Sequence, residues 1–117
     1  MQDQEISIRK AHQLLRESNN LFTTVFRHGT LEVEIYKPEK VDRQQPHDRD
    51  EVYVIASGTG TFHNGGRQYP FQPGDFLFVP AGVEHRFENF TPDFSTWVFF
   101  YGPVGGEGGA IRAGNDA

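Results

Sequence analysis

The spacing of hydrophobic residues changes once along the chain, near residue 20. In IRKAHQLLRESNN, hydrophobic residues including Ile8, Ala11 and Leu15 recur at three- and four-residue intervals, which predicts one short helix that ends at the asparagines. After residue 20 the period becomes two, most clearly in LEVEIYK, where Val33 and its hydrophobic neighbours alternate with glutamates. The chain therefore reads as one helix followed by strands.

The alternating pattern recurs in short segments separated by turn sequences. Strands are predicted at residues 21–27, 31–37, 51–56, 60–63, 67–71, 75–79, 85–88 and 96–101. The separators RHGT, HNGGR, QPGD and PAGVE contain the glycine, asparagine and proline that favour tight turns. Many short strands with almost no helix predict an all-β fold, an antiparallel sandwich or barrel.

The length of 117 residues suits one domain with one core. We expect a helical segment at residues 1–20, a barrel at residues 21–101, and a flexible glycine-rich tail at residues 102–117, to which no site is assigned.

Composition narrows the possible partners and ligands. The net charge of -5 and the absence of a long basic run disfavour nucleic acid and anionic membranes as partners. No segment has the length and hydrophobicity of a membrane span or of a signal peptide, so a soluble, cytoplasmic protein is expected. Without cysteine, any bound metal must use imidazole, carboxylate or amide oxygen ligands.

His47, Glu51 and His85 are the candidate metal ligands, because each stands at the edge of a strand that otherwise supplies hydrophobic residues. If their side chains point inward, a divalent cation would compensate the cost of burying them. Two histidines and one carboxylate form a facial triad that leaves coordination positions open. The alternatives are a hydrogen-bonded His/Glu cluster at the barrel mouth, or a surface charge run in HDRDE without a function.

The aromatic residues are interpreted mainly as core, since most of the 11 phenylalanines fall at alternate strand positions. Tyr53, Phe87, Trp97 and Tyr101 are nevertheless candidates for the wall of a substrate pocket, with burial in the core as the alternative for Phe87 and Trp97.

GDFLFVPAGVEHRFEN resembles the second conserved motif of the cupin superfamily. That motif has glycine, five residues, proline, one residue, glycine, two residues, histidine, three residues and asparagine. Its fixed positions fall here on Gly74, Pro80, Gly82, His85 and Asn89. All five match.

The first cupin motif is matched in part. His47, Glu51 and Gly58 occupy three of its places, but Gln45 stands where the family most often has its first histidine, and Glu39 stands where the motif usually begins with glycine. An amide oxygen is a weaker donor than imidazole. By this resemblance Gln45 is a fourth metal ligand or a neighbour of the ligands.

The resemblance implies a double-stranded β-helix, the jelly-roll cupin barrel, with a short N-terminal helix in front of it. Relatives with a single domain commonly form homodimers, so a homodimer is expected. The resemblance also implies a divalent transition metal, which is iron, manganese, zinc or nickel.

Function is less determined than fold, because cupins include dioxygenases, isomerases, lyases and binding proteins. The leading hypothesis is a metal-dependent enzyme that acts on a small polar molecule. The alternative is a non-catalytic module that binds a small molecule or a sugar. A narrower alternative is a sugar-phosphate isomerase, because HDRDEVYVIASGTG is similar to a run in cupin mannose-6-phosphate isomerases, with Arg49 and Arg86 as the nearest basic residues.

Overall fold

The fold was analysed in a computed structural model that describes residues 4–109 and 111. Within these residues the elements are α1 (Ile8–Ser18), β1 (Phe22–His28), β2 (Leu31–Tyr36), β3 (Asp50–Ser57), β4 (Gly60–Asn64), β5 (Arg67–Phe71), β6 (Phe76–Val79), β7 (His85–Glu88) and β8 (Ser95–Tyr101). The predicted strands differ from these bounds by at most one residue at each end.

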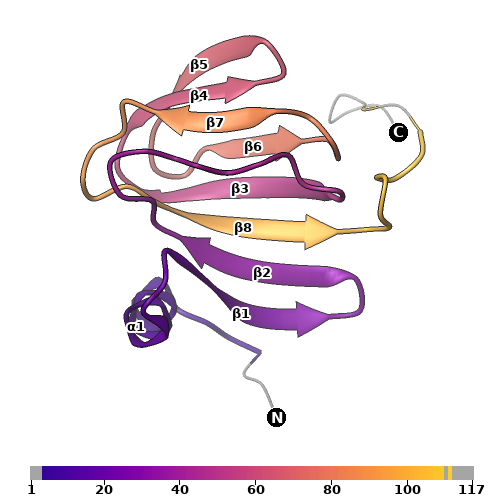
Figure 1. Cartoon of the computed structure of the whole chain (residues 1–117). Helices are drawn as coiled ribbons and strands as arrows, with labels where there is room; N and C mark the ends of the chain where they lie inside the picture. The colour runs from indigo at the N-terminus through magenta and orange to yellow at the C-terminus, as the bar shows by residue number, and fades with distance from the viewer. Residues whose placement is uncertain (1–3, 110, 112–117) are drawn as a thin grey trace.

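The strands form two antiparallel sheets that face each other (Figure 1). The larger sheet has the order β1-β2-β8-β3-β6, and the smaller sheet has the order β5-β4-β7. The predicted all-β jelly-roll barrel with a short N-terminal helix is confirmed. Because the smaller sheet has three strands, it covers only part of the larger sheet, and β1 and β2 lie farthest from it (Figure 1).

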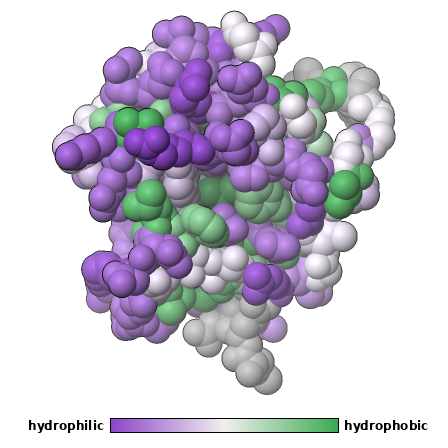
Figure 2. Space-filling model, viewed as in Figure 1, coloured by the Kyte–Doolittle hydropathy of each residue, from purple (hydrophilic) through white to green (hydrophobic). Residues whose placement is uncertain are grey.

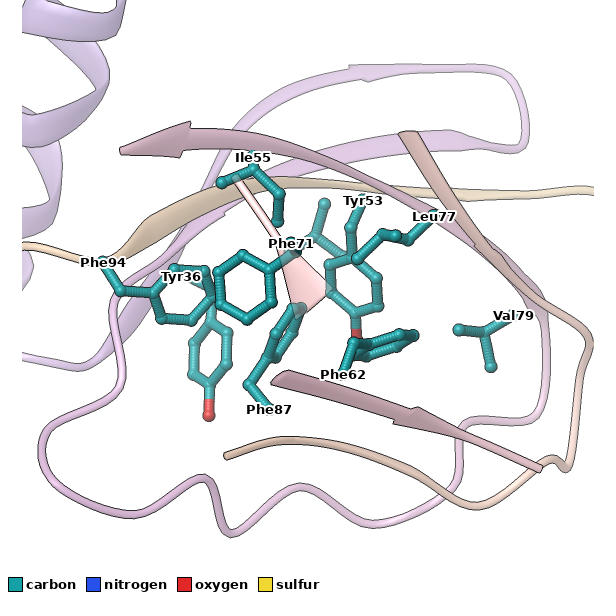
Figure 3. Close-up of a cluster of buried hydrophobic side chains, with 10 residues drawn as sticks. Tyr36, Tyr53, Ile55, Phe62, Phe71, Leu77, Val79, Phe87 and Phe94 are labelled. Carbon is teal, nitrogen blue, oxygen red and sulfur yellow. The ribbon is translucent and has the colours of Figure 1, made fainter. Parts of the chain in front are cut away.

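The core between the sheets is mainly aromatic (Figure 3). Tyr53, Phe62 and Phe87 are at most 1% exposed. The ring centroids of Phe62 and Phe87 are 4.6 Å apart, and those of Phe87 and Phe94 are 4.7 Å apart. Such ring packing supplies much of the hydrophobic stabilisation of a small domain. The interpretation of most phenylalanines as core residues therefore holds for this cluster.

The turn between β3 and β4 requires glycine at residue 58. Gly58 has a φ of 85°, and a Cβ atom at this position would lie 2.5 Å from the Cα atom of Phe94. A side chain would therefore suffer both backbone strain and a steric clash. This close approach explains the glycine that the first cupin motif has at this place.

Helix α1 covers the outer face of the larger sheet. Ser7 caps the helix by accepting a hydrogen bond from the backbone N–H of Lys10 at 3.0 Å. Ala11 and Leu15 pack against Ile35 of β2, and Trp97 of β8 borders the same cluster. The hydrophobic face of β2 is thus used to bind the helix.

The opposite face of β2 has Glu34 and Tyr36, which line the wall of a cavity. In the sheet register Glu34 is opposite Val98 of β8, and Val98 is in turn opposite Tyr53 of β3. Since side chains on paired residues share a face, the polar side of β2 and the side of β3 that has Glu51 and Tyr53 face the same way.

Part of the predicted tail is bonded to the loop before β3 and to the first residue of that strand. The backbone N–H of Gly105 donates to the carbonyl of Asp48 at 2.7 Å, and that of Glu107 donates to Asp50 Oδ2 at 2.7 Å. Residues 110 and 112–117 of the tail lie outside the described residues. Among the described helices, none is long and apolar enough to span a membrane.

Candidate metal centre

His47, Glu51 and His85 come together at one end of the barrel, with their possible ligand atoms all within 4.8 Å of one another. Glu51 Oε1 lies 2.9 Å from His85 Nε2 and 3.9 Å from His47 Nε2. The side chains of Glu51 and His85 are at most 1% exposed, whereas that of His47 is 34% exposed. The structure thus brings together all three residues that the strand pattern suggested.

Each of the three residues reaches the cluster from a different segment. Glu51 is the second residue of β3, and His85 is the first residue of β7 in the opposite sheet. His47 lies in the loop before β3, where its carbonyl accepts a hydrogen bond from the backbone N–H of Gly82 at 2.7 Å. Gly82 has a φ of 79°, a conformation that favours glycine. The turn before β7 therefore also positions the loop that bears His47.

The tautomer of His85 is set by the backbone. Its Nδ1–H donates to the carbonyl of Val83 at 2.9 Å, so in the neutral ring Nε2 has a free lone pair aimed at Glu51. The contact with Glu51 is a hydrogen bond only when Nε2 has a proton. Otherwise both carboxylate oxygens of Glu51 and Nε2 of His85 are buried without a donor among the described residues. Burial lowers the pKa of His85, but the bond to Glu51 and its negative charge outweigh this effect and raise the pKa.

Such a group of acceptors is a poor arrangement for a metal-free core, because a buried polar atom without a partner is costly. It is a good arrangement for a divalent cation, since two imidazoles and one carboxylate suit iron, manganese, nickel or zinc. The donor set therefore fits the metal that the sequence led us to expect.

Asp42, which sequence reasoning missed, orients a fourth possible ligand atom, the amide oxygen of Gln44, toward the cluster. Its carboxylate accepts hydrogen bonds from Tyr36 Oη at 2.6 Å, from the Phe87 N–H at 2.9 Å and from Gln44 Nε2 at 2.8 Å. Because the amide nitrogen of Gln44 faces Asp42, its Oε1 atom faces Tyr53 Oη at 3.0 Å and His47 Nε2 at 3.3 Å. Burial and the charge of Glu51 raise the pKa of Tyr53, which keeps its hydroxyl protonated as a donor.

The amide beside the cluster thus belongs to Gln44, while the structure places Gln45 exposed to solvent. The prediction for Gln45 came from the resemblance to the first cupin motif, and the alternation of a strand would also place residues 45 and 47 on one face. Strand β3 begins only at Asp50, so two-residue alternation does not apply to this loop. The only indication of Gln44 in the sequence was its position directly before Gln45 in QQP.

A cavity of about 590 Å³ opens beside the cluster. Its wall includes Phe22, Glu34, Tyr36, His47, Val98 and Phe100. His47 is the cluster residue that lines it, and the ring of Phe100 packs edge-on against the His47 ring with centroids 5.0 Å apart. Hydrophobic residues are visible near the middle of the face in Figure 2, in the region where Figure 1 shows β3 and β8.

The predicted pocket residues are divided among three places. Tyr53 is buried with its hydroxyl bonded to Gln44, and Phe87 is part of the core. Trp97 packs at the helix, and Tyr101 is paired with Asp50, so both lie on the face of β8 away from the cavity. The residues of β8 that line the cavity are Val98 and Phe100. Because β8 has hydrophobic residues on both faces, its sequence gives no indication of which face is inward.

Glu34 is a second residue that sequence reasoning missed. It lines the cavity on the β2 side, and burial together with the negative charges of Glu32 and Glu51 raises its pKa to about 7, although Arg27 opposes this shift. Its carboxyl is therefore present in both protonation states near neutral pH.

Comparison with curated proteins finds short stretches of similarity. The chain is 37% identical over 62 residues to an uncharacterized protein of Streptomyces coelicolor, a match that covers 53% of this chain and 59% of that protein. It is 41% identical over 39 residues to the oxalate-binding protein of Thermotoga maritima, covering 33% of this chain and 32% of that protein. The matches thus span less than two thirds of these relatives.

Solved structures extend the likeness to a larger share of the chain. A Cupin 2 conserved barrel domain protein from Salinispora arenicola superposes with a TM-score of 0.60 at 18% identity, covering 74% of this chain and 84% of that chain. At this identity the likeness shows the fold. The sequence profile of the cupin domain matches residues 32–101, which include the whole cluster and most of the cavity wall. The chain therefore belongs to the cupin domain family.

Proposed function

We propose that this protein binds a divalent transition metal through His47, Glu51 and His85 and acts on a small polar molecule in the adjacent cavity. The observation that supports this proposal most directly is the buried carboxylate of Glu51, which faces Nε2 atoms of two histidines and has no other donor among the described residues. A cation would satisfy all of them at once.

Gln44 is the fourth group that would contact the metal. Asp42 fixes the amide so that its oxygen faces His47 Nε2, and amide oxygens are ligands for divalent ions. The hydroxyl of Tyr53 donates to the same oxygen. This bond would weaken Gln44 as a ligand and also hold it in place.

When bound, the metal would supply a Lewis acid for a carbonyl or carboxylate oxygen of the substrate. The protein contributes the orientation. The ring of Phe100 holds His47 from one side, and the apolar wall that includes Val98 keeps water away from part of the bound molecule.

A second candidate function is binding of a small dicarboxylate without turnover. It is favoured by the local similarity to the oxalate-binding protein of Thermotoga maritima. Oxalate can chelate a divalent metal with two oxygens, so it would use the same cluster and the same open coordination positions.

The sugar-phosphate alternative has less support. Arg49 bonds to Glu32 at 3.3 Å, to the Gly102 carbonyl at 3.1 Å and to the Thr30 carbonyl. Arg86 pairs with Glu88 at 2.8 Å. Both arginines considered for a phosphate group are thus already engaged.

The proposal is tested by titrating the protein with Co²⁺ and recording its visible absorption, which reports coordination by nitrogen and oxygen ligands. We expect a saturable spectrum in the unchanged protein and in His63→Ala, whose histidine pairs with Glu88 away from the cluster. Glu51→Gln should not give that spectrum. An equal spectrum in all three proteins would overturn the site.

Oxalate then separates the two candidate functions. A change in the Co²⁺ spectrum when oxalate is added supports an open coordination position on the metal. Stable oxalate after long incubation with the metal-loaded protein favours the binding module, whereas its breakdown favours an enzyme.

A further inference from the structure

We propose that Glu34 is the proton-transfer residue of this cavity, placed on the wall opposite the metal cluster to exchange a proton with the bound molecule. The inference rests on the proposed function, because it requires a ligand that contacts the metal. It adds a role that neither cupin motif contains, since Glu34 precedes both motifs in the chain.

The sheet register places Glu34 within reach of such a ligand. Glu34 of β2 is opposite Val98 of β8, and Val98 is opposite Tyr53 of β3, two residues beyond Glu51. Strands lie about 4.8 Å apart, so the Cα atoms of Glu34 and Tyr53 are roughly 10 Å apart across the floor of the cavity. Glu34 and His47 line the same cavity. A small molecule held at the cluster would therefore lie over Val98 and extend toward Glu34.

The charged groups around Glu34 come from the neighbouring strands. Arg27 of β1 and Glu32 of β2 act on it from one side, and Glu51 of β3 acts on it from the cluster. Tyr36 and Val98 are its uncharged neighbours in the cavity wall, and the other charged or titratable residues that line the cavity are Glu39, Arg43 and His47. Two acidic groups and partial burial thus outweigh one arginine, which favours a carboxyl group that exchanges its proton near neutral pH.

Glu32 provides the contrast on the same strand and the same face. It is bonded to Arg49 at 3.3 Å, and this arginine also bonds to two backbone carbonyls. This ion pair suits Glu32 to hold the Arg49 loop. Glu34 instead lines the cavity beside the apolar residues Val98 and Phe100.

The proposed proton transfer needs no other reactant, because the proton returns to the molecule that it came from. One oxygen of the ionised Glu34 carboxylate takes a proton from an O–H group, or from a C–H group next to a carbonyl, and the electron pair of the broken bond stays on the bound molecule. The protonated carboxyl then returns the proton to the same molecule at another atom. The ligand class that suits this wall and the metal is a small hydroxy or oxo compound, with an oxygen at the cluster and an exchangeable proton a few bonds away.

The test measures the pKa of Glu34 by ¹³C NMR on protein labelled at the glutamate carboxyl carbons, with Glu34→Gln used to assign its signal. In metal-free protein we expect a titration near pH 7, and we expect it to move to lower pH in Glu32→Gln. Titration of Glu34 in the ordinary range of a solvated glutamate would overturn the proposal.

The same titration is repeated with saturating Zn²⁺. A cation facing the cavity favours the carboxylate, so the pKa of Glu34 should fall in the unchanged protein and stay constant in Glu51→Gln. A purely structural role would give no response to Zn²⁺, and such a result would also overturn the proposal. If Zn²⁺ does not bind at all, the metal site fails, while the metal-free titration still decides whether Glu34 has the protonation behaviour required.

Discussion

Two carboxylates are buried at this end of the barrel, and they differ in the hydrogen bonds that they accept. Asp42 is 4% exposed and accepts hydrogen bonds from Tyr36, Gln44 and the Phe87 backbone. Glu51 is 1% exposed, and neither of its oxygens has a donor among the described residues unless His85 is protonated. Nearly all buried polar groups in proteins are satisfied, so the exception points to function.

The difference in hydrogen bonding indicates different roles for Asp42 and Glu51. Asp42 joins β2, the loop before β3 and β7, and it orients Gln44. Its role is to hold the structure. Glu51 has at most one donor among the described residues, Nε2 of His85 when that atom is protonated, so it contributes less to the stability of the metal-free protein than Asp42 does. We propose that its role is to bind a cation.

The largest expected effect on stability is that of Asp42→Asn. An amide in place of the carboxylate puts a donor where only acceptors are needed, which should reduce the free energy of unfolding by about 3 kcal/mol. Urea denaturation of the metal-free protein measures this loss. Glu51→Gln, the matched change at the other carboxylate, should alter the same free energy by less than about 1 kcal/mol. An equal loss of unfolding free energy in the two variants would contradict the different roles of Asp42 and Glu51.

A smaller effect of opposite sign is expected for Glu34→Gln. The folded protein raises the pKa of Glu34 from 4.5 to about 7. The stability associated with its neutral form is therefore complete below pH 4.5 and is lost as the pH rises through 7. Glutamine stays neutral, so the variant should be more stable by about 1–2 kcal/mol at pH 8, a value reduced for the partial exposure of the carboxyl.

Urea denaturation from pH 4.5 to pH 8 measures this difference, which should be small at the acid end and grow toward the alkaline end. Glu32→Gln is the comparison variant and should give a smaller gain, because it lowers the pKa of Glu34 but also removes the ion pair between Glu32 and Arg49. A variant that is less stable than the original protein at pH 8 would contradict the assignment of Glu34.

Gln44 connects the two carboxylates, so its removal should weaken the metal site without abolishing it. Gln44→Leu should reduce metal affinity about 10-fold, because it removes the amide oxygen near His47 and one donor to Asp42. Isothermal titration with Zn²⁺ measures the change. Gln45→Leu is the matched control at an exposed position and should bind Zn²⁺ normally. The reverse pattern would restore Gln45 as the ligand.

The smallest effect is expected at Tyr101, which the sequence suggested as a pocket residue. Tyr101 is paired with Asp50 on the outer face of the sheet. Tyr101→Phe should leave Zn²⁺ affinity unchanged and alter the free energy of unfolding by less than about 0.5 kcal/mol. A clear loss of metal or ligand binding in this variant would show that the outer face takes part in the site.

The barrel and the three residues of the candidate metal cluster could be predicted from the sequence. His47, Glu51 and His85 were predicted because ionisable residues at the edges of hydrophobic strands are conspicuous. The amide at residue 44 was missed because the loop before β3 has no regular period. Trp97 and Tyr101 were misplaced relative to the cavity because β8 is apolar on both faces.

Glu34 could not be predicted for a different reason. A strand with alternating glutamates normally turns its charged side to water. In β2, however, helix α1 covers the hydrophobic face, and the charged face lines the cavity beside β8. Only the arrangement of the sheets reveals this. The homodimer expected from the family resemblance stays a prediction.

The most direct test of the central claim is the metal content of the protein, purified without chelator or metal-affinity resin and compared with that of Glu51→Gln. Elemental analysis should find about one ion of iron, manganese, nickel or zinc per chain, as expected for a site of this donor set, and almost none in the variant. The same metal content in both proteins, or no metal in either after incubation with these ions, would contradict the account.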